Sequence, residues 1–211
     1  MGERRSRMSM EEGDVNRRAN EKSARRKEAR TRMMAEKTQE KGLIIVHTGK
    51  GKGKSTAAFG MVMRCIGHGM KVGVVQFIKG KWETGERTVL ERFPELCEIK
   101  ALGEGFTWDT QNRARDIAHA EEAWAEVKRM MADPSFDFVL ADEINIALRY
   151  DYIPVAEVVA ALEGKRPDLH VCLTGRNAKD EIVALADLVT EMEMVKHPFR
   201  DGVKAQKGIE F

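Results

Sequence analysis

Cysteine is scarce in this sequence, and long apolar runs are missing. Cys65, Cys97 and Cys172 are odd in number, widely spaced and form no C-x-x-C pair. This pattern argues against a disulfide framework and a structural zinc site. No segment approaches the roughly 18–20 apolar residues of a membrane span, and the polar start lacks the apolar core of a signal peptide. We therefore expect reduced thiols in a cytoplasmic protein with no membrane partner.

Large apolar side chains are almost absent from residues 1–41. This segment carries 13 Lys/Arg and 8 Asp/Glu, a net charge of +5, whereas the remainder carries a net charge of −3. Its composition favours helix, but it cannot bury enough apolar surface to fold alone. Two interpretations stay open: a solvated, partly disordered leader, or a basic arm that orders on a partner subunit or ligand. We expect one domain over residues 42–211.

Strands and helices alternate through residues 42–211. The expected strands are 43–47, 71–77, 96–101, 136–141, 169–174 and 187–192, and the expected helices lie near 54–69, 112–132, 143–149, 154–163 and 178–186. Near-continuous apolar strands indicate helices on both faces of a mostly parallel sheet of about six strands. Residues 78–88 and 102–113 interrupt the pattern as loops at the carboxyl edge of the sheet, where ligands bind in such folds.

A glycine-rich turn, Gly49-Lys50-Gly51-Lys52-Gly53-Lys54-Ser55, follows the first apolar strand. Such a turn points backbone N–H groups inward, and the next helix directs its positive dipole end at the same place. Lys54 would reach phosphate oxygens, and the Ser55 hydroxyl would ligate Mg²⁺. Together with the alternating elements, this predicts an α/β, RecA-like P-loop fold. The predicted nucleotide-binding residues are Thr48, Gly49, Lys50, Gly51, Lys52, Gly53, Lys54, Ser55, Thr56 and Arg176.

The spacing of this turn is unusual for a phosphate loop. The common pattern is G-x-x-x-x-G-K-[ST], and the position five residues before Gly53 is Thr48 rather than glycine. Counted from Gly49, the loop is one residue short. The way in which it holds a nucleotide is therefore expected to differ from that of an ordinary NTPase.

Paired carboxylates, Asp142 and Glu143, end the apolar strand at 136–141. A carboxylate there can hold Mg²⁺ directly or through water, opposite Ser55. The alternative for Asp142 is an N-cap of the following helix. We favour the metal role because the phosphate loop already requires a Mg²⁺ partner, and which of the two carboxylates contacts the metal stays open.

Several other residues carry one functional and one structural interpretation. Phe106 and Trp108, like Trp82, either fill the core or form an apolar wall against a flat ligand. Arg176 ends a strand at the ligand edge, where it faces phosphate or caps the next helix. Trp124 and His47 are expected to be structural.

Together these residues resemble the P-loop corrinoid adenosyltransferases of the ATP:cob(I)alamin type, the BtuR/CobO family. The matching segments are 48–54, 74–80, Gly105-Phe106-Thr107-Trp108 with 109–113, 151–154 and Val203-Lys204-Ala205-Gln206-Lys207-Gly208-Ile209. The shortened loop is the family's own form. This chain departs from it by Ser55, where Thr is common, and by a longer, more basic leader.

The resemblance implies transfer of the 5′-deoxyadenosyl group of ATP to the cobalt of a reduced corrinoid, cob(I)alamin or cob(I)yrinic acid a,c-diamide, with release of triphosphate. It implies Lys54, Phe106 and Trp108 as catalytic residues, the two aromatics beneath the corrin ring. Ser55, Asp142 and Glu143 would hold Mg²⁺, or alternatively Mn²⁺. It also implies a homodimer, an arm that covers the corrinoid, and an electron donor such as a reduced flavin or flavoprotein.

Two other functions are compatible with parts of the sequence. A RecA-like ATPase or nucleotide switch could bind nucleic acid through the basic arm, although the arm's eight acidic residues dilute its positive field and no aromatic stacking platform accompanies it. A deoxynucleoside kinase is a third possibility, but the sequence lacks the zinc cysteines that one such group carries.

Overall fold

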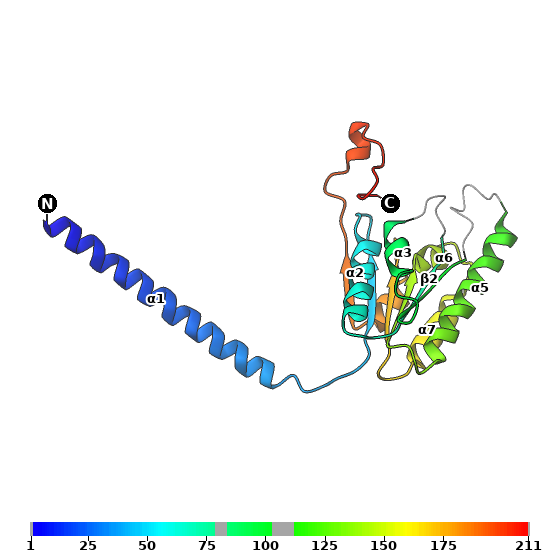
Figure 1. Cartoon of the computed structure of the whole chain (residues 1–211), viewed down its shortest axis with the longest axis horizontal. Coiled ribbons are helices and arrows are strands. Elements are labelled where there is room, and N and C mark those ends of the chain that lie inside the picture. The colour runs from blue at the N-terminus through cyan, green and yellow to red at the C-terminus, as the bar shows by residue number, and fades with distance from the viewer. Residues whose placement is uncertain (1, 79–83, 103–111, 211) are drawn as a thin grey trace. The chain divides into compact units, whose positions relative to one another are not determined.

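The structure is a computed structural model that describes residues 2–78, 84–102 and 112–210. It divides into two units, residues 1–40 and residues 41–211 (Figure 1). Within the described ranges, no helix is both long and apolar enough to cross a membrane.

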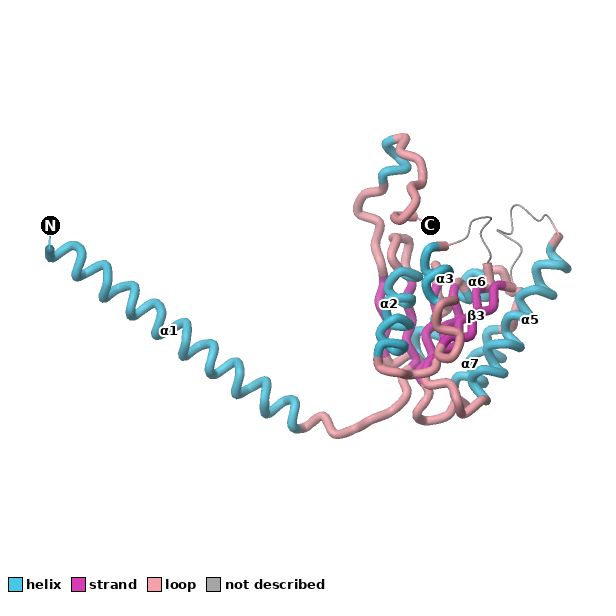
Figure 2. The backbone as a smooth tube through the Cα atoms, in the orientation of Figure 1, coloured by secondary structure: helices cyan, strands magenta, loops and turns pink. Residues whose placement is uncertain are grey.

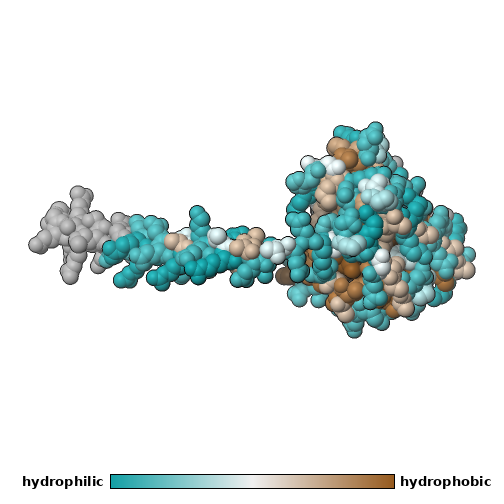
Figure 3. All heavy atoms as spheres, turned by 90° about the horizontal axis from the view of Figure 1, so that it is seen from below, coloured by the Kyte–Doolittle hydropathy of each residue, from teal (hydrophilic) through white to brown (hydrophobic). Residues whose placement is uncertain are grey.

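The first unit is a single helix, α1 (Gly2–Ala35), followed by a short connection. Pairs of opposite charge one turn apart support it, with Arg17 Nη2 2.7 Å from Asp14 Oδ1 and Arg32 Nη2 2.5 Å from Glu28 Oε1. Its surface is mostly hydrophilic where Figure 3 colours it, and Met33 and Met34 are exposed on it. The helix therefore owes its form to local propensity and charge pairs, because its described side chains, at 14 and 16–35, are all exposed.

The second unit is built on a six-stranded sheet. Its strands are β1 (Ile44–Thr48), β2 (Val72–Gln76), β3 (Cys97–Ala101), β4 (Phe138–Asp142), β5 (His170–Thr174) and β6 (Leu188–Glu191). They lie in the order β3-β2-β4-β5-β1-β6, and all five neighbouring pairs run parallel. The predicted parallel sheet is confirmed, with each strand boundary within two residues of its expected place.

Helices cover both faces of the sheet (Figure 2). They are α2 (Lys54–Gly67), α3 (Gly85–Leu90), α5 (Arg113–Ala132), α6 (Ile144–Arg149), α7 (Val155–Glu163) and α8 (Asp180–Leu185), followed by a 3₁₀ turn at Pro198–Asp201. One buried cluster joins α2 and α3 to one face, and a larger cluster joins α5, α6, α7 and α8 to the other. Trp124 of α5 lies in the larger cluster, as expected, and its indole N–H donates to Glu157 Oε1 at 3.0 Å.

One segment differs from the sequence prediction. Residues 78–88 were expected to form a loop, but α3 begins at Gly85. Its anchor is Leu90, which is buried against the α2 side of the sheet. Thr84 precedes the helix without a side-chain capping bond, and the only apolar side chains of the helix are the adjacent Val89 and Leu90, which show no helical period. The signals on which the prediction depends are therefore missing from this segment.

The strand order determines which loops meet. Strand β5 lies between β1 and β4, an arrangement typical of RecA-like P-loop folds. Since all three strands are parallel, their carboxyl ends lie at one edge of the sheet. The glycine loop after β1, the carboxylates after β4 and the Thr174–Arg176 turn after β5 are thereby brought together.

Candidate functional site

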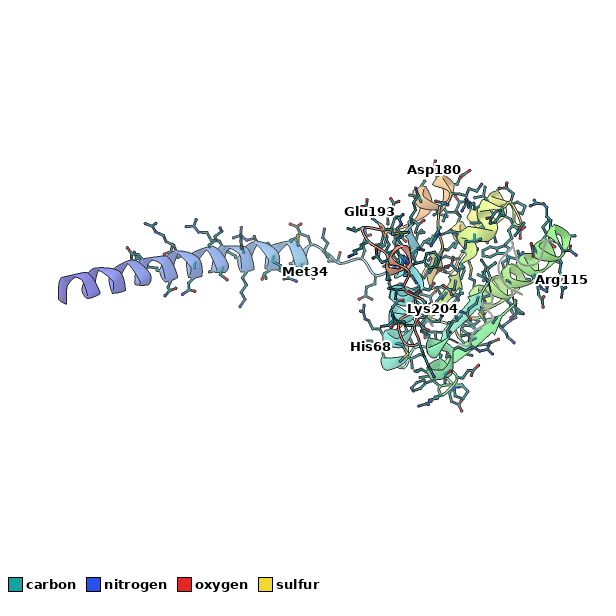
Figure 4. All side chains as sticks on the ribbon, turned by 90° about the horizontal axis from the view of Figure 1, so that it is seen from above. Met34, His68, Arg115, Asp180, Glu193 and Lys204 are labelled. Carbon is teal, nitrogen blue, oxygen red and sulfur yellow. The ribbon has the colours of Figure 1, made fainter. Side chains whose placement is uncertain are left out.

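The glycine loop contains backbone conformations and close contacts that favour glycine. Gly49 and Gly53 have φ angles of 96° and 106°, in the left-handed region. A Cβ on Gly49 would lie 2.4 Å from the carbonyl oxygen of Met192, and one on Gly51 would lie 2.5 Å from that of Glu193. The loop therefore packs against the chain that follows β6, on which Figure 4 labels Glu193. The Gly51 N–H donates to Met192 O at 2.6 Å.

Lys54 and Ser55 begin α2 directly after this loop. Gly53, the N-cap, offers no side-chain capping bond, so the helix N-terminus can present N–H groups to an anion. The Lys54 side chain is buried, and its ammonium donates to Gly51 O within the same loop. Burial lowers the pKa of Lys54, Glu143 opposes that shift, and the positive charges of Arg176 and Lys52 add to it. The Lys54 ammonium thus has less negative than positive charge around it, which suits the binding of an anion.

Asp142 is bonded by two side chains at the end of β4, and a third acts on it. Thr174 Oγ1 donates to its Oδ1 at 2.8 Å, and Gln76 Nε2 donates to its Oδ2 at 3.4 Å. The Ser55 hydroxyl acts to lower the pKa of the same carboxyl. Burial raises the pKa of Asp142, while these hydrogen bonds oppose that shift. The helix-capping alternative is wrong, because the N-cap of α6 is Glu143.

Glu143 has an unusual backbone and an unpaired oxygen. Its φ is 63°, a left-handed conformation that costs a side-chain-bearing residue about 1–2 kcal/mol. Its Oε2 is buried without a hydrogen-bond partner among the described residues. Burial, and then the negative charge of Asp142, raise the pKa of Glu143 to about 7, against the opposing effect of Lys54 and Arg176. This carboxyl is therefore poised to accept a cation or a proton.

The donor set fits a hydrated divalent cation carried by a polyphosphate. No group of three or more His, Cys, Asp or Glu side chains in the described ranges could hold a metal by itself. Mg²⁺ commonly takes only one or two carboxylates and fills its remaining positions with water and phosphate oxygens. The Ser55 hydroxyl, the Asp142 carboxyl on which it acts and Glu143 Oε2, which has no partner among the described residues, supply such a partial set.

The remaining predicted residues divide into three groups. Arg176 is exposed, and its charge acts on Lys52, Lys54 and Glu143, which places it within electrostatic reach of the site. Thr48 is buried, with its hydroxyl accepting from Ala178 N at 3.0 Å, so it tethers the loop after β5. The other predicted residues are exposed or undescribed: Lys50, Lys52 and Thr56 are exposed, whereas Trp82, Phe106 and Trp108 lie outside the described residues.

Lys52 is paired with the C-terminal chain rather than left alone in solvent. Its ammonium forms an ion pair with Glu210, and burial, then Arg176, lower its pKa. His47 has the structural role expected of it, since its buried ring contacts Lys54 O through Nδ1 at 3.2 Å.

Three polar residues of the site were missed by sequence reasoning. Gln76 and Thr174 end β2 and β5 and bond to Asp142, and Asn145, fully buried in α6, donates to Gly175 O at 3.2 Å. The available signal was a polar residue closing an otherwise apolar strand, which Gln76 and Thr174 share with Asp142. Asn145 had no comparable signal, because only the packing of α6 against the β5 turn gives it a partner.

Comparison with known proteins identifies the family to which the chain belongs. The sequence profile of the family described as "ATP:corrinoid adenosyltransferase BtuR/CobO/CobP" matches residues 40–211, which include the glycine loop, the carboxylate pair and Arg176. The chain belongs to the ATP:corrinoid adenosyltransferase family. The expected family membership is thereby confirmed over the whole second unit.

Relatives in the adenosyltransferase family extend over most of the chain. A corrinoid adenosyltransferase of Sinorhizobium sp. is 62% identical over 192 residues, 90% of each chain. One from Pseudomonas aeruginosa is 48% identical and covers 95% of this chain and 99% of its own. One from Escherichia coli K12 is 52% identical over 84% of this chain and 90% of its own. A crystal structure of the RadB recombinase aligns at a TM-score of 0.45, with 16% identity over 75% of this chain and 78% of that one.

Replacing Gly49 by Ala should disrupt the loop. The new Cβ would collide with Met192 O, and φ would be strained, so we expect ATP affinity to fall at least about tenfold, equivalent to about 1.4 kcal/mol. Gly60→Ala is the matched control, because a Cβ there meets nothing within 4 Å and favours the helix by about 0.5–1 kcal/mol. Isothermal titration of both variants with ATP checks this, and equal affinities would contradict the close packing.

Glu143→Gln should change how stability depends on pH. In the native fold the raised pKa of Glu143 means that the folded state holds the proton more tightly than the unfolded chain. The contribution of Glu143 to stability is therefore fully present below about pH 4.5 and is lost as the pH rises through about 7, by about 3 kcal/mol in total. The Gln variant should lack this loss and be the more stable protein at pH 8.

Urea unfolding of both proteins at pH 5 to 8, with EDTA and without nucleotide, measures this difference. If the free-energy difference between the two proteins stayed constant over that range, Glu143 would not be the titrating group.

Proposed function

We propose that this protein is an ATP-dependent corrinoid adenosyltransferase, which transfers the 5′-deoxyadenosyl group of ATP to the cobalt of a reduced corrinoid and releases triphosphate. The observation that carries the proposal is the shortened glycine loop, facing a buried carboxylate pair, in a chain whose family match spans residues 40–211. The acceptor is cob(I)alamin or a precursor such as cob(I)yrinic acid a,c-diamide.

The site is suited to hold a whole triphosphate as the leaving group. Gly49–Gly53 supply a backbone cradle, and Lys52, Lys54 and Arg176 concentrate positive charge around it. Because Lys54 bonds to Gly51 O within its own loop, it needs only a side-chain rotation to donate to a phosphate oxygen. Donors and cations fixed in advance stabilise the charge that develops as the C5′–O bond breaks.

Ser55, Asp142 and Glu143 would hold Mg²⁺, or Mn²⁺ in its place. The Ser55 hydroxyl acts to lower the pKa of Asp142, and Glu143 Oε2 has no partner among the described residues. When bound, the ion would neutralise part of the triphosphate charge and orient its oxygens. The three side chains would fix its position relative to Lys54.

The corrinoid side of the reaction needs no general base. Cobalt in the Co(I) state is itself the nucleophile that attacks C5′, so the protein must align the two substrates. Phe106 and Trp108 are proposed to form the apolar surface beneath the corrin ring, which would disfavour a lower axial ligand and ease reduction of Co(II). A reduced flavin or flavoprotein is the proposed electron donor, and a cytoplasmic setting suits the free thiols of the chain.

The products distinguish this proposal from the alternative ATPase. With ATP, Mg²⁺ and a reduced corrinoid, we expect equal amounts of adenosylated corrinoid and triphosphate, measured by chromatography and ³¹P NMR. Lys54→Ala should lower kcat/KM by about 10²–10³, as loss of a charge-stabilising donor does. Lys128→Ala is the control, because that exposed lysine pairs with Glu157 on the α5–α7 surface.

Formation of ADP and phosphate, stimulated by DNA or RNA in a salt-sensitive manner, would instead support the RecA-like ATPase with a nucleic-acid-binding arm.

Residues 1–41 are proposed to act as a lid over the corrinoid within a homodimer. A variant that lacks them should retain ATP affinity, while its KM for the corrinoid rises at least about tenfold, equivalent to about 1.4 kcal/mol. Sedimentation of the full chain should give a particle of two 23.8-kDa subunits. An unchanged KM for the corrinoid in the shortened protein would refute the lid.

A further inference from the structure

Thr174 occupies the junction of the site, although it lies on neither the glycine loop nor the carboxylate strand. It is the last residue of β5, the strand that lies between β1 and β4, and its side chain is fully buried. Its hydroxyl makes two bonds of 2.8 Å, donating to Asp142 Oδ1 and accepting from the backbone N–H of Glu143. One side-chain atom thus joins both members of the carboxylate pair.

The two bonds use different parts of the same hydroxyl. A backbone N–H can only donate, so the Thr174 oxygen accepts from Glu143. The hydroxyl proton remains available, and it is donated to Asp142 Oδ1 at 2.8 Å. This arrangement favours the ionised carboxylate at Asp142 and fixes its rotation, because Gln76 contacts the other oxygen.

The same hydroxyl supports the strained backbone at Glu143. The left-handed φ of 63° directs the Glu143 side chain back toward the β5 turn, where its Oε2 lies 3.2 Å from the position of a Cβ on Gly175. Gly175 is itself held by its N–H to His47 O at 3.2 Å and by Asn145. The bond from Glu143 N to Thr174 therefore ties this conformation to the buried start of the turn, Thr174 and Gly175.

We propose that Thr174 is a positioning residue that sets the geometry of Asp142 and Glu143 for a divalent cation bound with ATP. The inference rests on the proposed metal role of that pair. Thr174 touches neither nucleotide nor corrinoid in this proposal and acts only through the two carboxyl groups. Its hydroxyl should therefore matter for the metal-dependent part of ATP binding and not for the part that the glycine loop supplies.

The test is isothermal titration of ATP with Mg²⁺ and, separately, with EDTA. Thr174→Val keeps the shape but removes the hydroxyl, and it should weaken ATP binding with Mg²⁺ at least about tenfold, since a lost bond to a charged group is worth about 1.5–3 kcal/mol. Affinity in EDTA should stay unchanged. Thr174→Ser keeps the hydroxyl and should restore most of the Mg²⁺ effect.

Thr190→Val is the matched control. Thr190 faces the same residue of β1, His47, from the opposite neighbour β6, but it is exposed. It should bind ATP as the unchanged protein does under both conditions. If Thr174→Val does not fold, as judged by circular dichroism, Thr174→Ala is compared with Thr174→Ser instead. These two variants differ from each other only in the hydroxyl.

An equal loss in EDTA and in Mg²⁺, or a Ser variant as weak as the Val or Ala variant, would overturn the proposal. Because the titrations contain no corrinoid, their outcome is independent of which products the enzyme forms, and failure of the adenosyl-transfer proposal is recognised separately by ADP formation.

Discussion

Desolvation of two neighbouring carboxyl groups is the constraint on which the candidate site depends. Asp142 and Glu143 lie at the buried end of β4, and burial raises the pKa of both. A fold can hold such a pair only if hydrogen bonds and nearby cations offset the lost hydration. Thr174 and Gln76 supply bonds to Asp142, and Lys54 supplies charge near Glu143. The compensation is incomplete at Glu143 Oε2, and a cation would complete it.

An excess of positive charge lies beside this carboxyl pair. Lys52, Lys54 and Arg176 act on one another through their positive charges, and burial lowers the pKa of the two lysines. Charges of both signs that are only partly compensated within one site are costly to the protein without a ligand. They are suited to a ligand that carries both signs, a polyphosphate with its metal ion, because the site then needs little rearrangement on binding. Functional sites typically carry such a free-energy cost, which the rest of the fold offsets.

Backbone packing holds these charges in place. The glycines at 49 and 51 allow the chain after β6 to approach more closely than any side chain would permit. Gly175 does the same where the β5 turn meets α6. The glycine loop is therefore packed against the chain after β6, and the β5 turn is packed against α6, although both lie at the edge of the sheet. The basic arm is a separate unit, and its helix depends on its own charge pairs.

The sequence by itself determined the parallel sheet, nearly all helix positions, the glycine loop and the carboxylate pair, because apolar periodicity and glycine patterns are local properties. It did not reveal α3, whose stability depends on one buried leucine, or the parts played by Gln76, Thr174 and Asn145. These roles depend on which strands lie side by side. Thr174 is 32 residues from Asp142 along the chain, and only the insertion of β5 between β1 and β4 brings the two within hydrogen-bonding distance.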